Sequence, residues 1–242
     1  MSEKVKVIVN ADDFGFSEAV NYGIMKAFEH GIVTSTSIMA NMPGFEHAAA
    51  LAKQHPDLHI GVHLNVTCGK PLLQDGSTLT NEKGYFNREH GEEAKDEEII
   101  AELCAQIEKV KKAGLVIDHL DSHHHIHTEE RYANVIARIL EMYPFPIRGG
   151  FMYPCDYPKQ TKLIIEFYDK TIAQADLERI IKGLKPNAVY DLMCHPAYLD
   201  DILIEISSYQ MQRIKELEVL CSEETKHFIK AEQIELTTYS HI

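Results

Sequence analysis

The stretch KVKVIVNADDFG, residues 4–15, decides the fold class. Residues 4–10 form an apolar run that is typical of a buried strand, and the chain then breaks into a polar turn at residues 11–15. Ser17 stands where a helix N-cap is expected, and apolar residues follow at helical spacing up to Gly31, at Val20, Ile24, Ala27 and Phe28. A buried strand, a short turn and an amphipathic helix make up one βα unit.

The same alternation continues along the chain. Further strands are predicted at residues 34–40, 59–65, 115–120, 146–151, 188–194 and 234–238, and helices at residues 45–53, 96–113, 129–143, 163–168, 175–184 and 207–223. Alternating strands and helices predict an α/β protein with parallel strands. Six or seven such units suggest a barrel or a barrel-like open sheet. The rival is a doubly wound sheet, but no G-x-G-x-x-G follows the first strand and the chain has no P-loop.

Composition excludes several classes of function. The chain has 242 residues, with 24 basic and 37 acidic side chains, and a net charge of −13 argues against nucleic-acid binding. No apolar run approaches the roughly 18 residues that a membrane span needs. The N-terminus lacks the order of a signal peptide, and the five scattered cysteines contain no C-x-x-C pair. We therefore expect a single-domain cytoplasmic protein, residues 1–242, with free thiols.

Polar side chains with catalytic or metal-binding chemistry cluster where predicted strands end. Asp12 and Asp13 follow the first strand, His63 ends the third, Asp121 and the tract HHHIH at residues 123–127 follow the fourth, and His195 follows residues 188–194. The active site of a βα barrel lies at the carboxyl ends of its strands. These four groups are therefore expected to meet at one end of the barrel.

Each of these groups also has a structural explanation. Asp12 and Asp13 are common turn formers, and a lone histidine such as His63 in an apolar strand is more often structural than a ligand. The functional interpretation gives one aspartate to a metal ion and the other to substrate, as general base. Of the histidine tract, His123 lies nearest the strand end, whereas His124 takes the opposite face of an extended segment. Asp118 or Asp121 could orient a ligand imidazole.

Two further residues are candidates on weaker grounds. His195 precedes Pro196 and is either a hydrogen-bonded turn residue or a general acid. Arg148, in the segment PIRGG, is either a surface charge or a group that holds a catalytic carboxylate or a substrate oxygen with two hydrogen bonds. The sequence alone leaves both alternatives open.

Four segments resemble the YdjC-like carbohydrate deacetylase family of the chitooligosaccharide deacetylase type. They read VNADDFGFSEAVNYGI, GIVTSTSIMAN, IGVHLNVTCGKPL and HLDSHHHIH, and beyond Met142 the resemblance thins to RGG and DLMCHP. The resemblance implies a distorted (β/α) barrel of the glycoside hydrolase/deacetylase type. It also implies a homodimer that removes N-acetyl groups from small acetylated saccharides with a divalent ion, Mg²⁺ first and Zn²⁺ second.

The resemblance also implies the roles of individual residues. Asp13, His63 and His123 would hold the ion, Asp12 would be the general base, His195 the general acid, and Arg148 a substrate contact. A glycosidase or a phosphoglycoside-cleaving enzyme is the alternative on the same fold, although it needs two carboxylates about 5–9.5 Å apart that flank the bond. A metal-storage or sugar-binding protein is a third hypothesis, and it has no use for a base and an acid.

The polar stretch at residues 66–93 shows no clear period. It carries Gly69, Gly76, Gly84 and Gly91 together with Tyr85 and Phe86. We expect either a lid that stacks on a sugar or a solvated loop with a small hairpin of its own.

Overall fold

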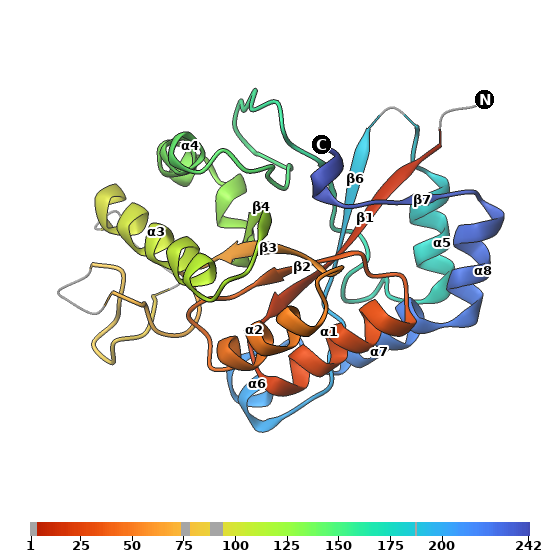
Figure 1. Ribbon diagram of the computed structural model, residues 1–242, viewed down its shortest axis with the longest axis horizontal. Helices are drawn as coiled ribbons and strands as arrows, with labels where there is room; N and C mark the ends of the chain where they lie inside the picture. Colours follow the sequence, from red (N-terminus) through yellow and green to blue (C-terminus); the bar gives the residue numbers. More distant parts are fainter. Residues whose placement is uncertain (1–3, 74–77, 88–93, 187) are drawn as a thin grey trace.

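The computed structural model describes residues 4–73, 78–87, 94–186 and 188–242 (Figure 1). Its strands are β1 (Lys6–Phe14), β2 (Ser35–Ile38), β3 (His59–Leu64), β4 (Ile117–Ser122), β5 (Lys162–Ile164), β6 (Val189–Cys194) and β7 (Glu235–Leu236). Its α-helices are α1 (Glu18–His30), α2 (Phe45–Gln54), α3 (Asp96–Lys112), α4 (Ala133–Met142), α5 (Gln174–Lys182), α6 (Asp201–Ile206), α7 (Met211–Cys221) and α8 (Glu223–Ala231). Short 3₁₀ segments η1 (His123–Thr128), η2 (Glu130–Tyr132) and η3 (Tyr239–His241) complete the chain.

The strands form a distorted barrel. Six parallel strands pair in the order β4-β3-β2-β1-β6-β5, and β7 adds to the start of β1. The gap between β4 and β5 is bridged by Ile147, which pairs with Leu120 on one side and with Gln160 on the other. The backbone N–H of the next residue, Arg148, donates a hydrogen bond to Leu120 O at 3.0 Å. The predicted fold, a distorted (β/α) barrel, is therefore confirmed.

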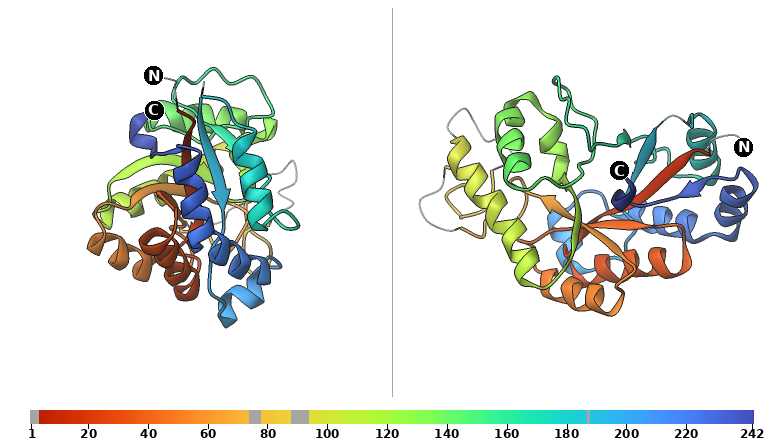
Figure 2. Two further views of the ribbon diagram at one scale, coloured as in Figure 1. Left: turned by 90° about the vertical axis from the view of Figure 1, so that its right-hand side faces the viewer. Right: turned by 45° about the horizontal axis from the view of Figure 1, so that its top comes forward.

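The outer face of the barrel packs against helices. Alternate residues of a strand point to opposite faces, and Val7 and Val9 of β1 share the apolar core with Val20 and Ile24 of α1. Helices α3 and α4 cover one flank of the sheet, and α5 and α8 cover the opposite flank (Figures 1 and 2). Ser17 caps α1 as expected, since its hydroxyl accepts a hydrogen bond from Val20 N at 3.3 Å.

The inner face of the barrel is polar. Asn10 donates to Ser37 at 2.7 Å, and Ser37 donates to Asp121 at 2.7 Å, so three strands are joined by side chains inside the barrel. Gly61 leaves the room that His119 occupies, because a Cβ at position 61 would lie 2.2 Å from His119 Nε2. The barrel interior therefore contains charged and hydrogen-bonding side chains directly beneath the strand ends.

Three predicted elements differ from those in the structure. Residues 163–168 were expected to be helical, but the first two of them belong to β5, which pairs in parallel with β6, and residues 165–168 are not helical. The helix expected at residues 207–223 is present as the shorter α7, but it is not the last helix, because Ser222 caps a further helix, α8. The strand predicted at residues 146–151 is reduced to the single bridging residue Ile147.

The stretch at residues 66–93 is described in part. Its residues 74–77 and 88–93, including Gly76 and Gly91, lie outside the described residues. Thr80 and Phe86 form an antiparallel bridge around the turn at residues 81–85, so the described part contains a small hairpin.

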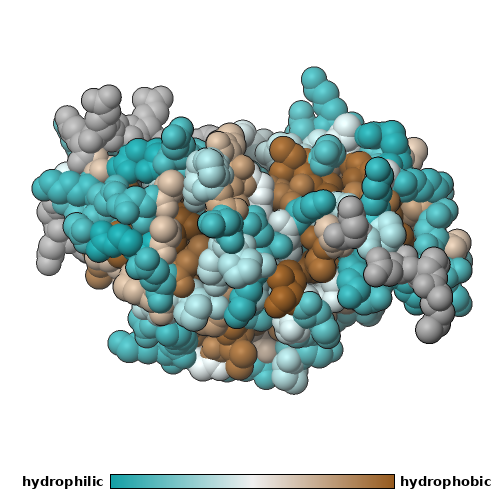
Figure 3. Space-filling model, turned by 90° about the horizontal axis from the view of Figure 1, so that it is seen from above, coloured by the Kyte–Doolittle hydropathy of each residue, from teal (hydrophilic) through white to brown (hydrophobic). Residues whose placement is uncertain are grey.

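The surface seen from above is mostly hydrophilic, with apolar residues gathered in separate patches (Figure 3). Among the described helices, none is both long enough and apolar enough to span a bilayer.

Candidate active site

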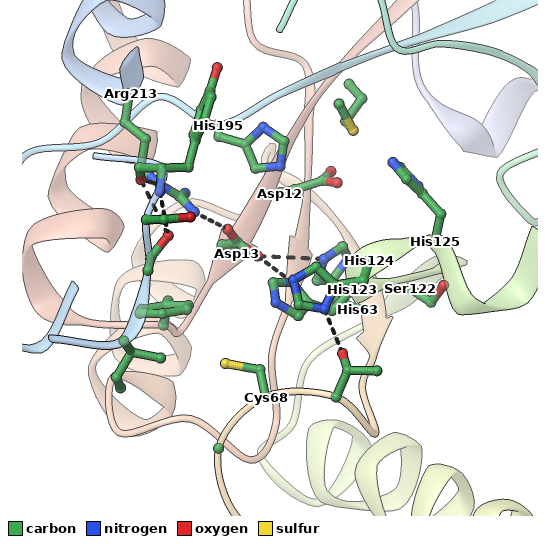
Figure 4. Close-up of a pocket in the computed structure, with 18 of the residues that line it drawn as sticks. Asp12, Asp13, His63, Cys68, Ser122, His123, His124, His125, His195 and Arg213 are labelled. Carbon is green, nitrogen blue, oxygen red and sulfur yellow. Dashed lines mark hydrogen bonds and ion pairs between the residues drawn. The ribbon is translucent and has the colours of Figure 1, made fainter. Parts of the chain in front are cut away.

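The four predicted strand ends meet at one end of the barrel. Asp12 and Asp13 lie at the end of β1, His63 near the end of β3, His123 directly after β4, and His195 directly after β6. All five line one pocket of about 660 Å³ (Figure 4). The structure therefore brings together residues that are far apart in sequence, as the βα topology requires.

Asp12 and Asp13 both face the pocket although they are neighbours in a strand. The backbone of Asp13 has a φ of +74°, and the register between β1 and β2 shifts between Ala11 and Phe14. A left-handed conformation is uncommon for a residue other than glycine and often marks a functional site. This local distortion turns the second carboxylate into the same cavity as the first.

Asp13, His63 and His123 form the candidate metal site. Asp13 Oδ1 lies 3.1 Å from His123 Nδ1 and 3.5 Å from His63 Nε2, and the three ligand atoms all lie within 4.8 Å of one another. Within the described part of the chain, Asp13 Oδ1 is buried and accepts no hydrogen bond. A buried carboxylate oxygen that faces two imidazole nitrogens fits a divalent cation.

A second group, Asp12, His63 and Asp121, is equally compact but already contains a cation. Arg148 Nη1 lies 2.7 Å from Asp12 Oδ2 and 3.0 Å from Asp121 Oδ2. Because the guanidinium already supplies positive charge to both carboxylates, we interpret this group as a buried ion-pair cluster.

Asp121 contacts the candidate ligand His63. Its Oδ1 accepts a hydrogen bond from His63 Nδ1 at 2.8 Å, so Nε2 is the nitrogen that faces Asp13 and the metal position. Burial alone would lower the pKa of His63, but the carboxylates of Asp121, Asp12 and Asp13 raise it to about 9. Asp118, the other candidate for this role, instead contacts His119 at 2.5 Å and His59 at 2.9 Å.

Arg148 holds Asp12 from behind. Its Nη1 and Nη2 each donate to one oxygen of Asp12 at 2.7 Å, and its Nε donates to Asp191 at 2.7 Å. Burial favours the neutral acid at Asp12, but the guanidinium keeps the pKa of that carboxyl below its ordinary value. Arg148 is 0% exposed and lies behind Asp12 rather than on the pocket wall. This geometry favours the other alternative, a grip on a carboxylate of the candidate site, over the predicted substrate contact.

His195 lies on the pocket wall beside two tyrosines. Tyr168 and Tyr209 stack with their ring centroids 4.2 Å apart, and each meets the His195 ring edge-on. Burial lowers the pKa of His195 to about 3, although the Asp13 carboxylate opposes this shift. Its Nδ1 is buried without a hydrogen-bond partner among the described residues. The imidazole is therefore neutral at pH 7, and it belongs to a residue that lines the pocket.

The histidine tract does not continue as an extended strand. His124 and His125 have φ values of +52° and +55°, so the chain turns in η1. The ring centroid of His124 lies 3.9 Å from that of His123, and its Nδ1 is 2.8 Å from Thr67 Oγ1. The expectation that His124 points away from His123 was therefore wrong.

Arg213 of α7 also contacts the candidate metal site, and it was not among the residues predicted from the sequence. Its Nη2 donates to Asp13 Oδ2 at 2.7 Å, across 200 residues of sequence. Burial would raise the pKa of Asp13, but Arg213 and His123 hold it well below the ordinary value. An arginine in an amphipathic helix gives no sign of such a contact.

The fold and the site together define a (β/α)-barrel protein with a candidate metal centre at the carboxyl ends of its strands. The family model of YdjC-like proteins matches residues 6–231, and the chain belongs to this family. The carbohydrate deacetylase of Brevibacillus brevis is 40% identical over 247 aligned residues, covering 98% of this chain and 100% of the relative. That of Geobacillus stearothermophilus is 42% identical over 236 residues, covering 96% of each chain.

Solved structures agree with the fold. An Enterococcus faecalis protein, provisionally called a cellobiose-phosphate cleavage protein, superposes with a TM-score of 0.91 at 34% identity and covers 98% of both chains. A family 4 carbohydrate esterase from Streptomyces lividans superposes with a TM-score of 0.55 at 7% identity, covering 98% of this chain and 94% of the esterase. At that identity the second likeness concerns the fold alone.

Proposed function

We propose that the protein is a metal-dependent hydrolase that removes N-acetyl groups from small acetylated saccharides such as chitooligosaccharides. The observation that carries the proposal is the open cluster of Asp13, His63 and His123 beside Asp12 and His195 in one pocket. The relatives from Brevibacillus and Geobacillus, both named carbohydrate deacetylases, support it.

Asp13, His63 and His123 would hold the ion. A divalent ion there would polarise the acetyl carbonyl and lower the pKa of a bound water molecule. Magnesium is the ion that the resemblance implies, whereas two imidazole ligands suit zinc. Metal analysis of the purified protein by mass spectrometry therefore decides between the two.

Asp12 would take the proton from the attacking water. Its carboxylate is ionised at neutral pH because Arg148 lowers its pKa. Arg148 and Asn10 fill part of its acceptor capacity, but Oδ2 accepts only the Arg148 hydrogen bond among the described residues. A carboxylate offers about four lone-pair sites, so Oδ2 keeps one for the water proton.

His195 would deliver a proton to the leaving nitrogen. Since its imidazole starts neutral, His195 would take up this proton from solvent during the reaction, while the proton that Asp12 removed from the water returns to solvent. Negative charge that develops on the acetyl oxygen raises the pKa of a neighbouring imidazole. The C–N bond then breaks, and the products are acetate and an amino sugar.

A glycosidase mechanism fits this site less well. It needs two carboxyl groups that are free to flank a glycosidic bond. Asp12 is held by Arg148, and Asp13 is held by Arg213 and faces two histidines. The name given to the Enterococcus faecalis protein keeps cleavage of a phosphorylated disaccharide as the alternative to be tested.

Two substrates separate these functions. The metal-loaded protein is incubated with diacetylchitobiose and with cellobiose 6-phosphate, and acetate and reducing sugar are both measured. We expect acetate from the first substrate and no new reducing sugar from either. Cleavage of cellobiose phosphate without acetate release from diacetylchitobiose would overturn the proposal.

We also propose a homodimer, which rests on the resemblance. Sedimentation at micromolar concentration is expected to give about twice the chain mass of 27.5 kDa, and a monomer alone would contradict it.

A further inference from the structure

One nitrogen of Arg213 has no hydrogen-bond partner in the part of the chain that the structure describes. Its Nε donates to Tyr209 O at 2.9 Å and its Nη2 to Asp13 Oδ2 at 2.7 Å. Its Nη1 is buried and has no hydrogen-bond partner among the described residues. A guanidinium carries five N–H donors, and a buried donor that is left unpaired costs stability. This open donor therefore needs an explanation.

Arg148 shows what a buried arginine with every nitrogen paired looks like in the same protein. Both side chains are almost inaccessible, at 0% exposure for Arg148 and 3% for Arg213. Every nitrogen of Arg148 contacts a carboxylate, from Asp12, Asp121 or Asp191. Arg148 lies behind the site, whereas Arg213 lies on the pocket wall. This difference indicates that the hydrogen bonding of Arg213 is completed only when a ligand is bound.

The open nitrogen belongs to a side chain next to the metal position. Arg213 grips one oxygen of Asp13 while the other oxygen of that carboxylate faces His63 and His123. Figure 4 shows Arg213 beside Asp13, with His195 next to it along the wall. Arg213 therefore lines the pocket and directly contacts the carboxylate of the candidate metal site.

The charges at this position favour an anion. Asp13 and Arg213 cancel each other, so a divalent ion bound by Asp13 keeps its full double charge toward a ligand. The reaction described under the proposed function creates negative oxygen twice, in the tetrahedral intermediate and in the released acetate. A preorganised donor that binds charged oxygen better than neutral carbonyl oxygen lowers the barrier.

We propose that Arg213 is a substrate-contacting residue whose Nη1 binds an oxygen of the acyl group, both in the tetrahedral intermediate and in the carboxylate product. This inference rests on the proposed deacetylase function and adds a small-carboxylate position beside the metal site. It makes Arg213 bifunctional, since one nitrogen orients Asp13 and another receives the acyl oxygen.

Sodium acetate is the probe. Binding of acetate to the metal-loaded wild-type protein is measured by calorimetry and by the NMR signals of the arginine side chains. We expect acetate to shift the guanidinium signal of Arg213 and to leave that of Arg148 in place. Absence of any Arg213 shift at saturating acetate would overturn the inference.

Arg213→Lys and Arg213→Gln test the same point by substitution. Lysine keeps a positive charge beside Asp13, but its ammonium group lacks the planar geometry with which a guanidinium donates to Asp13 and to an acyl oxygen at the same time. At saturating metal, both variants are expected to bind acetate about 10- to 100-fold more weakly and to lose kcat by a similar factor. Acetate affinity within twofold of wild type in either loaded variant would refute the contact. A purely positioning role predicts instead that excess metal restores kcat.

Arg179→Gln is the matched control, because it removes the same charge from a side chain that is 62% exposed and pairs with Asp176. It is expected to leave acetate binding unchanged. The inference and the proposed function fail separately: acetate that binds Arg213 in a protein without deacetylase activity refutes the function, and activity with an unresponsive Arg213 refutes the inference.

Discussion

Arg148 and Asp12 face each other inside the barrel as a two-pronged ion pair, with Nη1–Oδ2 and Nη2–Oδ1 distances that are both 2.7 Å. Arg148 follows the residue that bridges the gap between β4 and β5, and Asp12 lies near the end of β1, so the segment that closes the barrel also fixes the candidate base. The contacts that close the barrel therefore also position Asp12 in the candidate site.

Arg148→Met is expected to destabilise the protein strongly. The substitution leaves Asp12, Asp121 and Asp191 close together in the interior without their shared counter-charge, and breaking a buried ion pair costs about 3–5 kcal/mol. Chemical denaturation measures the loss. The control is Arg138→Met, which removes an exposed pair with Glu97 and should change little. Equal stability of the two variants would contradict this role.

Asp121→Asn is expected to weaken metal binding by about 10- to 100-fold, because a neutral amide fixes the His63 ring less firmly than a carboxylate. Calorimetric titration with zinc and magnesium measures the change. Asp118→Asn, in the same strand, is the control, since Asp118 contacts His119 and His59 rather than a proposed ligand. Loss of affinity in the control alone would show that the orienting carboxylate has been misassigned.

Glu216→Gln tests a buried carboxyl that supports His195. Burial raises the pKa of Glu216 from 4.5 to about 8, and the side chain accepts hydrogen bonds from the backbone N–H of His195 and from Tyr209. Between these two pH values the folded protein holds a proton that the unfolded chain has released. The contribution of Glu216 to stability therefore falls as pH rises through this window and is constant above it.

Glutamine carries no such proton. The free energy of unfolding of Glu216→Gln, relative to wild type, is therefore expected to be more favourable at pH 8 than at pH 5. Denaturation curves at both pH values measure the difference, and parallel pH profiles for the two proteins would rule out the raised pKa.

Tyr85→Ala tests the hairpin of the 66–93 stretch. Tyr85 lines the pocket with 47% of its surface exposed, and Phe86 beside it is buried. If the tyrosine ring stacks on a sugar, KM for a disaccharide rises severalfold while metal affinity and Tm stay as in wild type. The exposed Tyr22 of α1 gives the control variant, Tyr22→Ala. An unchanged KM in Tyr85→Ala would leave the hairpin without a substrate role.

The sequence predicted those parts of the site that strand ends determine. A buried strand that runs into Asp12 and Asp13, and another that runs into His123, place these side chains at one end of a barrel whatever the details of the loops. The same reasoning could not find Arg213, because its contact with Asp13 depends on where α7 packs. It also could not find the left-handed turn at His124 and His125, which no residue preference announces.

Arg148 shows another limit of prediction from the sequence. A bidentate grip on a carboxylate was one predicted alternative, and its geometry depends on a bridge of one residue, Ile147, in a region where a full strand was expected. Local β propensity indicated an extended segment at residues 146–151, but pairing on both sides is confined to one residue. The length of that pairing is set by the barrel as a whole.

The most direct test of the account compares acetate release from diacetylchitobiose by metal-loaded wild type and by Asp12→Asn, with the metal content of both proteins measured in parallel. The account predicts one ion per chain in each protein and turnover that is lower in the variant by about 10²–10⁴-fold. Equal turnover would remove Asp12 from the mechanism. Loss of the ion from the variant would show that Asp12, rather than Asp13, is the ligand.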